Sequence, residues 1–139
     1  MDTTHTRRTF IKTASLATSA VAMTAASYAR VPGANDRIRL AMIGCGSRGR
    51  GAHMVGVHRY DKEQNVEFTV VCDPWKPMRE DAAQMAKDWY GTDAKQCSSY
   101  LDVMAMDDVD AVMIASPDFW HTRPLKAAAD AKKDAYCEK

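Results

Sequence analysis

The chain has 139 residues, of which 46% are hydrophobic and 27% charged, a composition typical of one soluble globular domain. Its net charge of +1 comes from the N-terminal stretch, because residues 31–139 hold 15 basic and 17 acidic side chains. A slightly acidic body without a basic stripe argues against nucleic acid or an anionic membrane surface as a partner.

Residues 1–30 are predicted to be an export leader. They contain Thr6-Arg7-Arg8-Thr9-Phe10-Ile11-Lys12, which resembles a twin-arginine signal, followed by a mildly apolar stretch and by the small residues Ser27 and Ala29 before a peptidase site. The apolar stretch is too short and too rich in hydroxyls for a membrane span, so no stable membrane insertion is expected. We expect the twin-arginine translocase to export a folded bacterial protein to the periplasm or beyond; a disordered basic tail is the alternative.

Beyond the leader, strands and helices alternate. The strands are predicted at residues 37–43, 66–72, 111–115 and 135–137, with a weaker signal at 94–97. The first three are almost continuous apolar runs, which is typical of parallel strands covered on both faces. Helical patterns fill the gaps at residues 49–59, 77–89, 101–106 and 122–129, with Gly91 as a stop signal and Ser99 and Asp102 as a capping box.

This alternation predicts an α/β fold. Strand and helix in turn imply right-handed crossovers and a Rossmann-type, doubly wound parallel sheet with strand order 3-2-1-4-5. Residues 36–139 would form one nucleotide-binding domain, incomplete at its C-terminal end.

The cysteines and histidines give no metal pattern. The four cysteines are Cys45, Cys72, Cys97 and Cys137, and three of them lie at or just beyond strand ends, where a small buried thiol is common. Export would permit disulfides, but we expect none, and no CxxC motif is present. The five-residue spacing of two helical histidines at positions 53 and 58 does not suit a shared metal, so both are expected at the surface or in packing.

A glycine motif follows the first predicted strand. Gly44, Gly46 and Gly49 have the spacing GxGxxG, in which the first glycine permits a tight turn, the second lets a diphosphate approach, and the third lets helix and strand pack closely. The following helix would offer amide donors to the phosphates.

An acid at the end of the second strand strengthens that interpretation. Asp73 lies 24 residues after the last glycine, close to the spacing of the dinucleotide fingerprint. A carboxylate there can accept hydrogen bonds from the ribose hydroxyls and repels a 2′-phosphate, so NAD is favoured over NADP, although Lys76 and Arg79 would soften the preference. S-adenosylmethionine binding and a plain turn residue are the alternatives at this point.

Later segments distinguish these alternatives. Ala115-Ser116-Pro117-Asp118-Phe119-Trp120-His121 and Ala135-Tyr136-Cys137-Glu138-Lys139, together with the glycine motif and Asp73, resemble the glucose–fructose oxidoreductase / inositol dehydrogenase family, written Gfo/Idh/MocA. That family shows GxGxxG, the acid, A-[ST]-P-x-x-x-H and E-K-P in this order. The resemblance covers residues 38–139.

The resemblance implies a role for each matching residue. Gly44, Gly46, Ser47, Arg48 and Gly49 would line the diphosphate, and Asp73 would hold the adenosine ribose. Asp118, Trp120 and His121 would lie along the nicotinamide side, with Glu138 beside the ring. Lys139 would be the catalytic residue, stabilising the alkoxide that develops as hydride leaves the carbon. His121, Lys139 and Arg48 could instead be ordinary helix, strand-end and surface residues.

Three functions remain open. The first is an exported NAD-dependent oxidoreductase that acts on a sugar, polyol or related secondary alcohol. The second is a glycoside hydrolase that uses NAD for transient oxidation and elimination, and the third is a protein that only binds the nucleotide. Family members continue into a second α/β domain, so we expect this chain alone to lack turnover. The complete protein is expected to be a homo-oligomer, and an exported one should carry its cofactor with it.

Overall fold

The computed structural model describes residues 37–139, and the predicted leader lies outside them. The strands are β1 (Ile38–Ile43), β2 (Val66–Cys72), β3 (Lys95–Cys97), β4 (Ala111–Ile114) and β5 (Asp134–Cys137). The helical elements are η1 (Gly49–Met54), α2 (Val55–His58), α3 (Asp61–Gln64), α4 (Lys76–Tyr90), α5 (Tyr100–Met104), η2 (Asp118–Trp120) and α6 (Thr122–Asp130).

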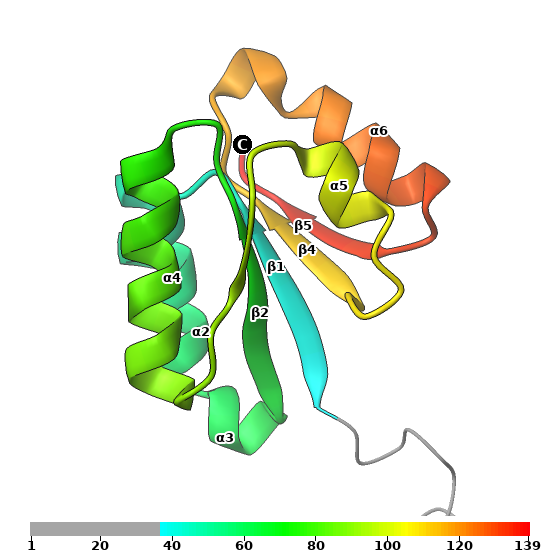
Figure 1. The fold of residues 1–139 in the computed structure, drawn as a ribbon. Helices are drawn as coiled ribbons and strands as arrows, with labels where there is room; N and C mark the ends of the chain where they lie inside the picture. The colour runs from blue at the N-terminus through cyan, green and yellow to red at the C-terminus, as the bar shows by residue number, and fades with distance from the viewer. Residues whose placement is uncertain (1–36) are drawn as a thin grey trace, which may run out of the picture. The chain divides into compact units, whose positions relative to one another are not determined.

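The five strands form one parallel sheet in the order β3-β2-β1-β4-β5, which confirms the predicted Rossmann-type topology (Figure 1). Helices α2 and α4 cover one face of the sheet and α5 and α6 cover the other (Figure 1). The order of the strands reverses at β1, and ligands bind such sheets in the crevice at the carboxyl ends of the strands beside that reversal. A ligand site is therefore expected at the carboxyl ends of β1, β2 and β4.

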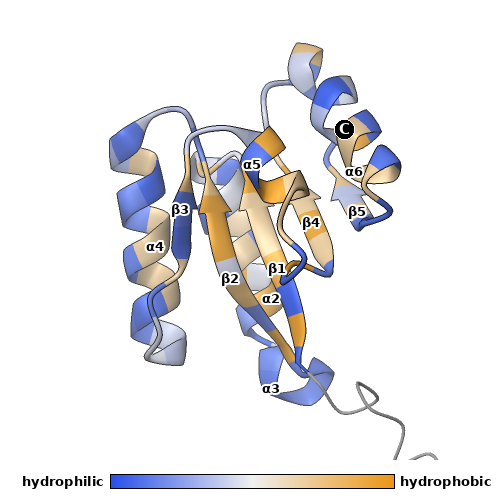
Figure 2. Cartoon of the chain, turned by 45° about the vertical axis from the view of Figure 1, so that its right-hand side comes forward, coloured by the Kyte–Doolittle hydropathy of each residue, from blue (hydrophilic) through white to orange (hydrophobic). Residues whose placement is uncertain are grey.

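A bulge in β2 changes the face of the sheet on which its side chains lie. The register between β1 and β2 shifts between Leu40 and Ala41, which leaves Thr69 as the extra residue of β2. One extra residue reverses the alternation of side chains along a strand. Phe68 consequently packs in the core beneath α4, whereas Val70 packs in the core beneath α5 and α6. The apolar runs predicted from sequence are the orange strands at the centre of Figure 2.

The helix after β1 differs from a regular α-helix. Helical backbone runs from residue 47 to residue 58, close to the predicted range, but Gly49–Met54 is a π-helical turn. A π-turn pairs residues five apart instead of four and is frequent at functional sites.

The remaining elements agree closely with the predicted ones. The weak strand signal corresponds to β3, and α4 ends at Gly91, whose φ of 72° is the left-handed conformation of a helix stop. Ser99 accepts a hydrogen bond from the Leu101 amide at 3.2 Å, which is one half of the predicted capping box. The sequence pattern missed α3, a single turn between α2 and β2.

The four cysteines are free thiols. Cys45, Cys72 and Cys97 are buried near the strand ends, as the sequence pattern indicated. Burial raises the pKa of Cys45 and that of Cys72 to about 12, so these two thiols stay protonated at neutral pH.

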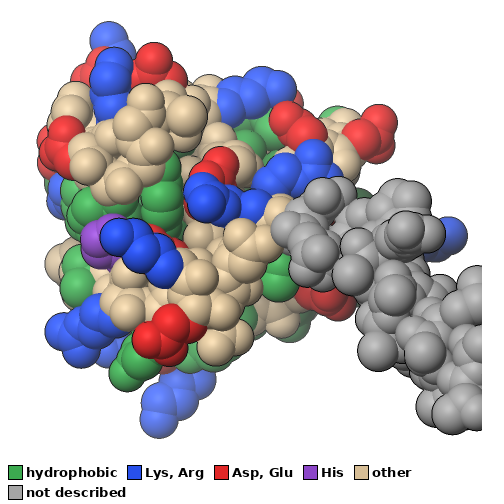
Figure 3. All heavy atoms as spheres, turned by 90° about the horizontal axis from the view of Figure 1, so that it is seen from below, with side chains coloured by type: hydrophobic (Ala, Val, Ile, Leu, Met, Phe, Trp, Pro, Cys, Tyr) green, Lys and Arg blue, Asp and Glu red, His purple; other side chains and the backbone are tan. Residues whose placement is uncertain are grey.

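The surface of residues 37–139 carries both signs of charge. In the view of Figure 3, lysines and arginines lie interspersed with aspartates and glutamates, without one continuous basic stripe. None of the helices in this range is long and apolar enough to cross a membrane.

Candidate functional site: a nucleotide cavity at the strand ends

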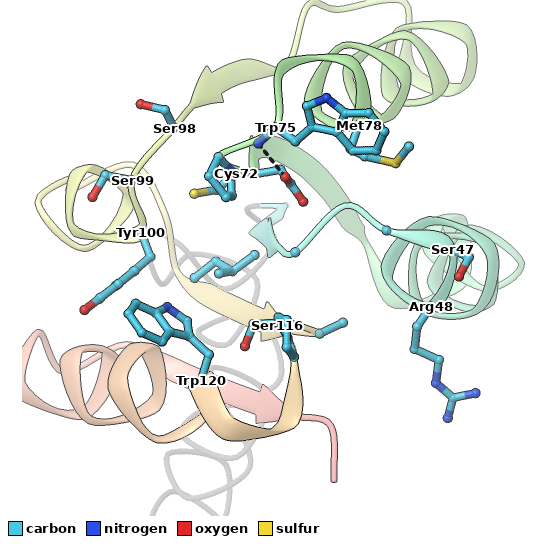
Figure 4. Close-up of a pocket in the computed structure, with 17 residues that line it drawn as sticks. Ser47, Arg48, Cys72, Trp75, Met78, Ser98, Ser99, Tyr100, Ser116 and Trp120 are labelled. Carbon is cyan, nitrogen blue, oxygen red and sulfur yellow. Dashed lines mark hydrogen bonds between the residues drawn. The ribbon is translucent and has the colours of Figure 1, made fainter.

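A cavity of about 670 Å³ opens at the carboxyl ends of β1, β2 and β4 (Figure 4). Its lining residues come from four segments: Ile43, Gly44, Gly46, Ser47 and Arg48; Cys72, Asp73, Pro74, Trp75 and Met78; Ser98, Ser99 and Tyr100; and Ala115, Ser116, Pro117 and Trp120. This is the size of pocket that takes a nucleotide-sized ligand, and it lies at the topological reversal of the sheet.

Each of the three positions in the turn requires glycine for a different structural reason. Gly44 has a φ of +91°, and a Cβ there would lie 2.6 Å from the Ala115 carbonyl oxygen. A Cβ on Gly49 would collide with the Gly44 carbonyl oxygen, so the turn packs against the helix that follows it. A Cβ on Gly46 would meet nothing within 4 Å, so bare backbone faces the open cavity there. The first and third glycines shape the turn, and the second leaves room for a ligand.

Asp73 is fixed by backbone donors at the end of β2. Its Oδ2 accepts from the Cys45 amide and its Oδ1 from the Trp75 amide, both at 2.8 Å. The Arg79 guanidinium donates to the Asp73 carbonyl oxygen at 2.6 Å. Each carboxylate oxygen has a second lone pair, so the group can still accept from a ligand hydroxyl. The glycine turn therefore positions the predicted ribose-binding acid directly.

Aromatic side chains border the cavity on two sides. Trp75 follows Asp73, while Tyr100 from α5 and Trp120 from η2 point toward each other (Figure 4). The Arg123 guanidinium lies 4.3 Å from the centre of the Trp120 ring, a cation–π contact that holds it. Trp120 was predicted from the sequence, whereas Trp75 and Tyr100 were missed. Their position directly after β2 and β3 is the signal that could have identified them.

Arg48, His53 and Glu138 form a charged cluster at the edge of the cavity. The Arg48 Nε donates to Glu138 Oε2 at 2.8 Å, and His53 Nε2 lies 2.7 Å from the same oxygen. The hydrogen bond from Arg48 is the main reason that the pKa of Glu138 is lowered to about 2. His53 is nearly buried and also contacts the Tyr136 ring edge-on at 5.3 Å. His53 was expected at the surface or in packing, and the structure shows a packing residue whose Nε2 lies beside a carboxylate.

The loop after β4 carries a second polar pair. Ser116 Oγ lies 3.0 Å from His121 Nδ1, and His121 Nε2 is buried without a hydrogen-bond partner among the described residues. His121 itself does not line the cavity, although Ser116 does. The histidine therefore holds the serine side chain at the cavity wall.

The structure brings most of the predicted site residues together. Those that line the cavity are Gly44, Gly46, Ser47, Arg48, Asp73 and Trp120. Gly49 lies beneath the turn, Glu138 contacts the cavity through Arg48, and Asp118, His121 and Lys139 lie outside the lining. Lys139 is exposed, just after β5. Within residues 37–139 no three His, Cys, Asp or Glu side chains converge on a metal-sized site.

Comparison with known proteins agrees with this geometry. Residues 38–139 match the family model described as an oxidoreductase family with an NAD-binding Rossmann fold. A glycosyl hydrolase family 109 protein 2 from Shewanella sp. (strain ANA-3) is 31% identical over 154 residues, covering 95% of this chain and 33% of the relative.

Solved structures of similar fold include a dehydrogenase and a ketoreductase with bound nicotinamide cofactors. The WlbA dehydrogenase from Bordetella pertussis, in complex with NADH and UDP-GlcNAcA, is 27% identical with a TM-score of 0.59, covering 74% of this chain and 29% of that one. The 3-ketoreductase KijD10 from Actinomadura kijaniata, in complex with NADP and TDP-benzene, is 25% identical with a TM-score of 0.59, covering 75% and 29%.

The chain spans about a third of the length of the curated relative. The match includes the glycine turn, Asp73, the loop after β4 and the end of β5, which are the segments that surround the cavity. The chain belongs to the Gfo/Idh/MocA oxidoreductase family and contains its NAD-binding Rossmann domain.

Proposed function

We propose that residues 37–139 hold NAD as the cofactor domain of an oxidoreductase that acts on a sugar, polyol or related secondary alcohol. The observation that carries the proposal is the contact between the glycine turn and Asp73. Bare backbone at Gly46 faces the cavity, and the neighbouring Cys45 amide fixes the carboxylate that would accept from the adenosine ribose. Both parts of a dinucleotide fingerprint thus lie at one cavity wall.

The chain's own residues would bind and orient the cofactor. Gly44, Gly46, Ser47, Arg48 and Gly49 would surround the diphosphate, and Asp118, Trp120, His121 and Glu138 would lie on the nicotinamide side. When bound, NAD would supply the hydride acceptor. The Lys139 ammonium would stabilise the alkoxide of the substrate and assist removal of its proton.

NAD is proposed over NADP because of Asp73. The Asp73 carboxylate, fixed by two backbone amides, is held in a position where it would repel a 2′-phosphate. The side chains of Lys76 and Arg79 lie close in sequence, but Arg79 is engaged with the Asp73 carbonyl oxygen. Relatives of this family bind one or the other cofactor, as the NADH and NADP complexes above illustrate.

Binding of NADH to the 139-residue chain tests the proposal. Trp75 and Trp120 line the cavity, so energy transfer from tryptophan to bound NADH should be measurable. Gly46→Val should abolish binding without loss of stability, because its side chain would enter open cavity space. Gly51→Val, a matched change at another glycine with nothing within 4 Å, should bind like the wild type. Equal binding by both variants would contradict the proposed position of the diphosphate.

A glycoside hydrolase that uses NAD transiently is the second candidate, favoured by the Shewanella relatives named as glycosyl hydrolase family 109 proteins. The Glu138-Lys139 ending favours the oxidoreductase. In the complete protein, net formation of NADH from a sugar alcohol would support the oxidoreductase. Release of an aglycone without net redox change would support the hydrolase.

Export and assembly complete the proposal. We propose that the complete protein is exported by the twin-arginine route to the periplasm, already loaded with cofactor, and that it is a homo-oligomer. Denaturing protein purified without added cofactor should release NAD. Protein that emerges empty and binds NAD only weakly would argue against loading before export. The 139-residue chain alone is proposed to bind the cofactor without turnover.

A further inference from the structure

One carboxylate connects the glycine turn to the far side of the sheet. Glu138 follows β5, two strands away from β1, yet its Oε2 contacts both Arg48 and His53 from the helix that follows β1. Its Oε1 faces the Lys139 amide at 3.4 Å, and its own amide donates to the Ile114 carbonyl oxygen at 2.9 Å. The end of β5 is thereby tied to the diphosphate turn.

The π-turn makes this shared contact possible. Arg48 and His53 are five residues apart, and in an α-helix of 3.6 residues per turn such residues point about 140° apart. A π-turn has the i to i+5 pairing that brings them to the same side. The departure from α-helical geometry in Gly49–Met54 therefore has a specific result: two basic side chains converge on one carboxylate oxygen.

Arg48 is held by one nitrogen and keeps two for another partner. Its hydrogen bond to Glu138 uses Nε, and the terminal nitrogens make no hydrogen bond with the described residues. The side chain is 63% exposed, whereas that of Glu138 is 13% exposed. It leaves the turn on the side of the cavity opposite Tyr100 and Trp120 (Figure 4). A guanidinium anchored through Nε can still offer a paired set of donors to an oxyanion.

We propose that Glu138 is a positioning residue of the nucleotide site, which holds Arg48 through Nε so that its terminal nitrogens donate to the dinucleotide diphosphate. The inference rests on the proposed NAD function and deepens it. Glu138 acts on the cofactor through Arg48, and His53 Nε2 lies against the same carboxylate oxygen from the second side. Its ionised form is maintained by the same contacts, which lower the pKa of Glu138.

A comparison of ligands with and without a diphosphate tests this role. Adenosine and ADP are titrated by calorimetry into the wild-type chain, Arg48→Ala, Glu138→Ala and the double variant. Loss of one positioned charged contact should weaken ADP about tenfold in each single variant and leave adenosine unchanged. The double variant should be no weaker than Arg48→Ala, because both changes remove the same contact. Glu63→Ala, an exposed acid on α3, is the matched control.

Two conservative variants extend the test. Glu138→Gln keeps an oxygen that can accept from Nε and should retain most of the ADP affinity. Arg48→Lys keeps the charge but has one donor group, which cannot hold Glu138 and bind the diphosphate as a guanidinium does. It should lose ADP affinity about fivefold, and this variant does not depend on how well Glu138→Ala folds.

The outcomes separate this proposal from the proposed function. Wild-type affinity for ADP in Arg48→Lys, an equal loss for adenosine and ADP in Glu138→Ala, or additive losses in the double variant would each overturn the positioning role. A wild-type chain that binds neither NADH nor ADP would instead refute the proposed function itself.

Discussion

The inner part of the sheet, around β1 and β2, and its outer part, β5 with η2, differ in how deeply their side chains are buried. Around β1 and β2 the side chains are buried on both faces, and Asp73 is fixed by two amides. At β5, three of four residues are exposed, and Phe119 in η2 is 84% exposed. The inner part contains the groups proposed for the adenosine and the diphosphate, whereas the outer part carries those proposed for the nicotinamide and the substrate. Substitutions should therefore have larger effects in the inner part.

The largest effect is expected at Gly49. Gly49→Val would drive its side chain into the Gly44 carbonyl oxygen, and the backbone of the turn cannot yield as a flexible side chain would. The free energy of unfolding, measured in urea, should fall by at least about 3 kcal/mol. Gly51→Val is the control, and its free energy of unfolding should fall far less, because nothing lies within 4 Å of a Cβ at that position. Similar losses in the two variants would show that the turn is not packed as described.

Asp73→Asn should have the next largest effect, on binding. In the wild type, two charged oxygens accept from the Cys45 and Trp75 amides and would also accept from the ribose hydroxyls. Asparagine has a single, uncharged acceptor oxygen, so it cannot make all of these hydrogen bonds. Hydrogen bonds to a charged group contribute about 1.5–3 kcal/mol, so NADH affinity should fall about 100-fold, and NADPH affinity should fall less. Asp108→Asn, at an exposed acid away from the cavity, should leave both affinities unchanged. An unchanged ratio of NADH to NADPH affinity would remove Asp73 from cofactor selection.

Alkaline pH should weaken the inner part through its thiols. Because burial raises the pKa of Cys45 and of Cys72 to about 12, the folded chain keeps their protons while the unfolded chain releases them above pH 9. Stability is thus complete below pH 9 and is lost as pH rises, by up to about 1.4 kcal/mol per pH unit for each thiol. Urea unfolding in reducing buffer between pH 8 and 10 measures this slope. Replacing both cysteines with alanine should reduce the slope; an unchanged slope would assign it to other groups, such as Cys97 and Cys137, whose pKa values burial also raises.

The smallest effect is expected at the outer rim. Trp120 lines the cavity, whereas its neighbour Phe119 does not, so the two residues form a matched pair. Trp120→Ala should weaken NADH about fivefold by removing one aromatic contact, and Phe119→Ala should leave affinity unchanged. Calorimetry serves as the measurement, since the first variant removes a fluorescent reporter. A reversed order would place the ligand on the other side of η2.

Much of the fold and part of the site could be predicted from local patterns. Apolar runs identified the strands, and their alternation with helices indicated a doubly wound sheet, for which this strand order is typical. The bulge at Thr69 left no such signal, since it depends on how β2 pairs with β1. Tyr100 was missed although it closely follows a strand, because the strand signal for β3 was weak and the residue reaches the cavity only when β3 lies beside β2.

The sequence by itself determined the glycine turn and the acid after β2, because turn geometry and strand ends depend on residues that are close along the chain. It could not determine that Glu138 contacts Arg48 and His53 across two strands. That contact needs the sheet order, the end of β5 and a π-turn together, and a π-turn brings residues five apart to one side where an α-helix would separate them. Long-range packing, not local pattern, decided which charges meet.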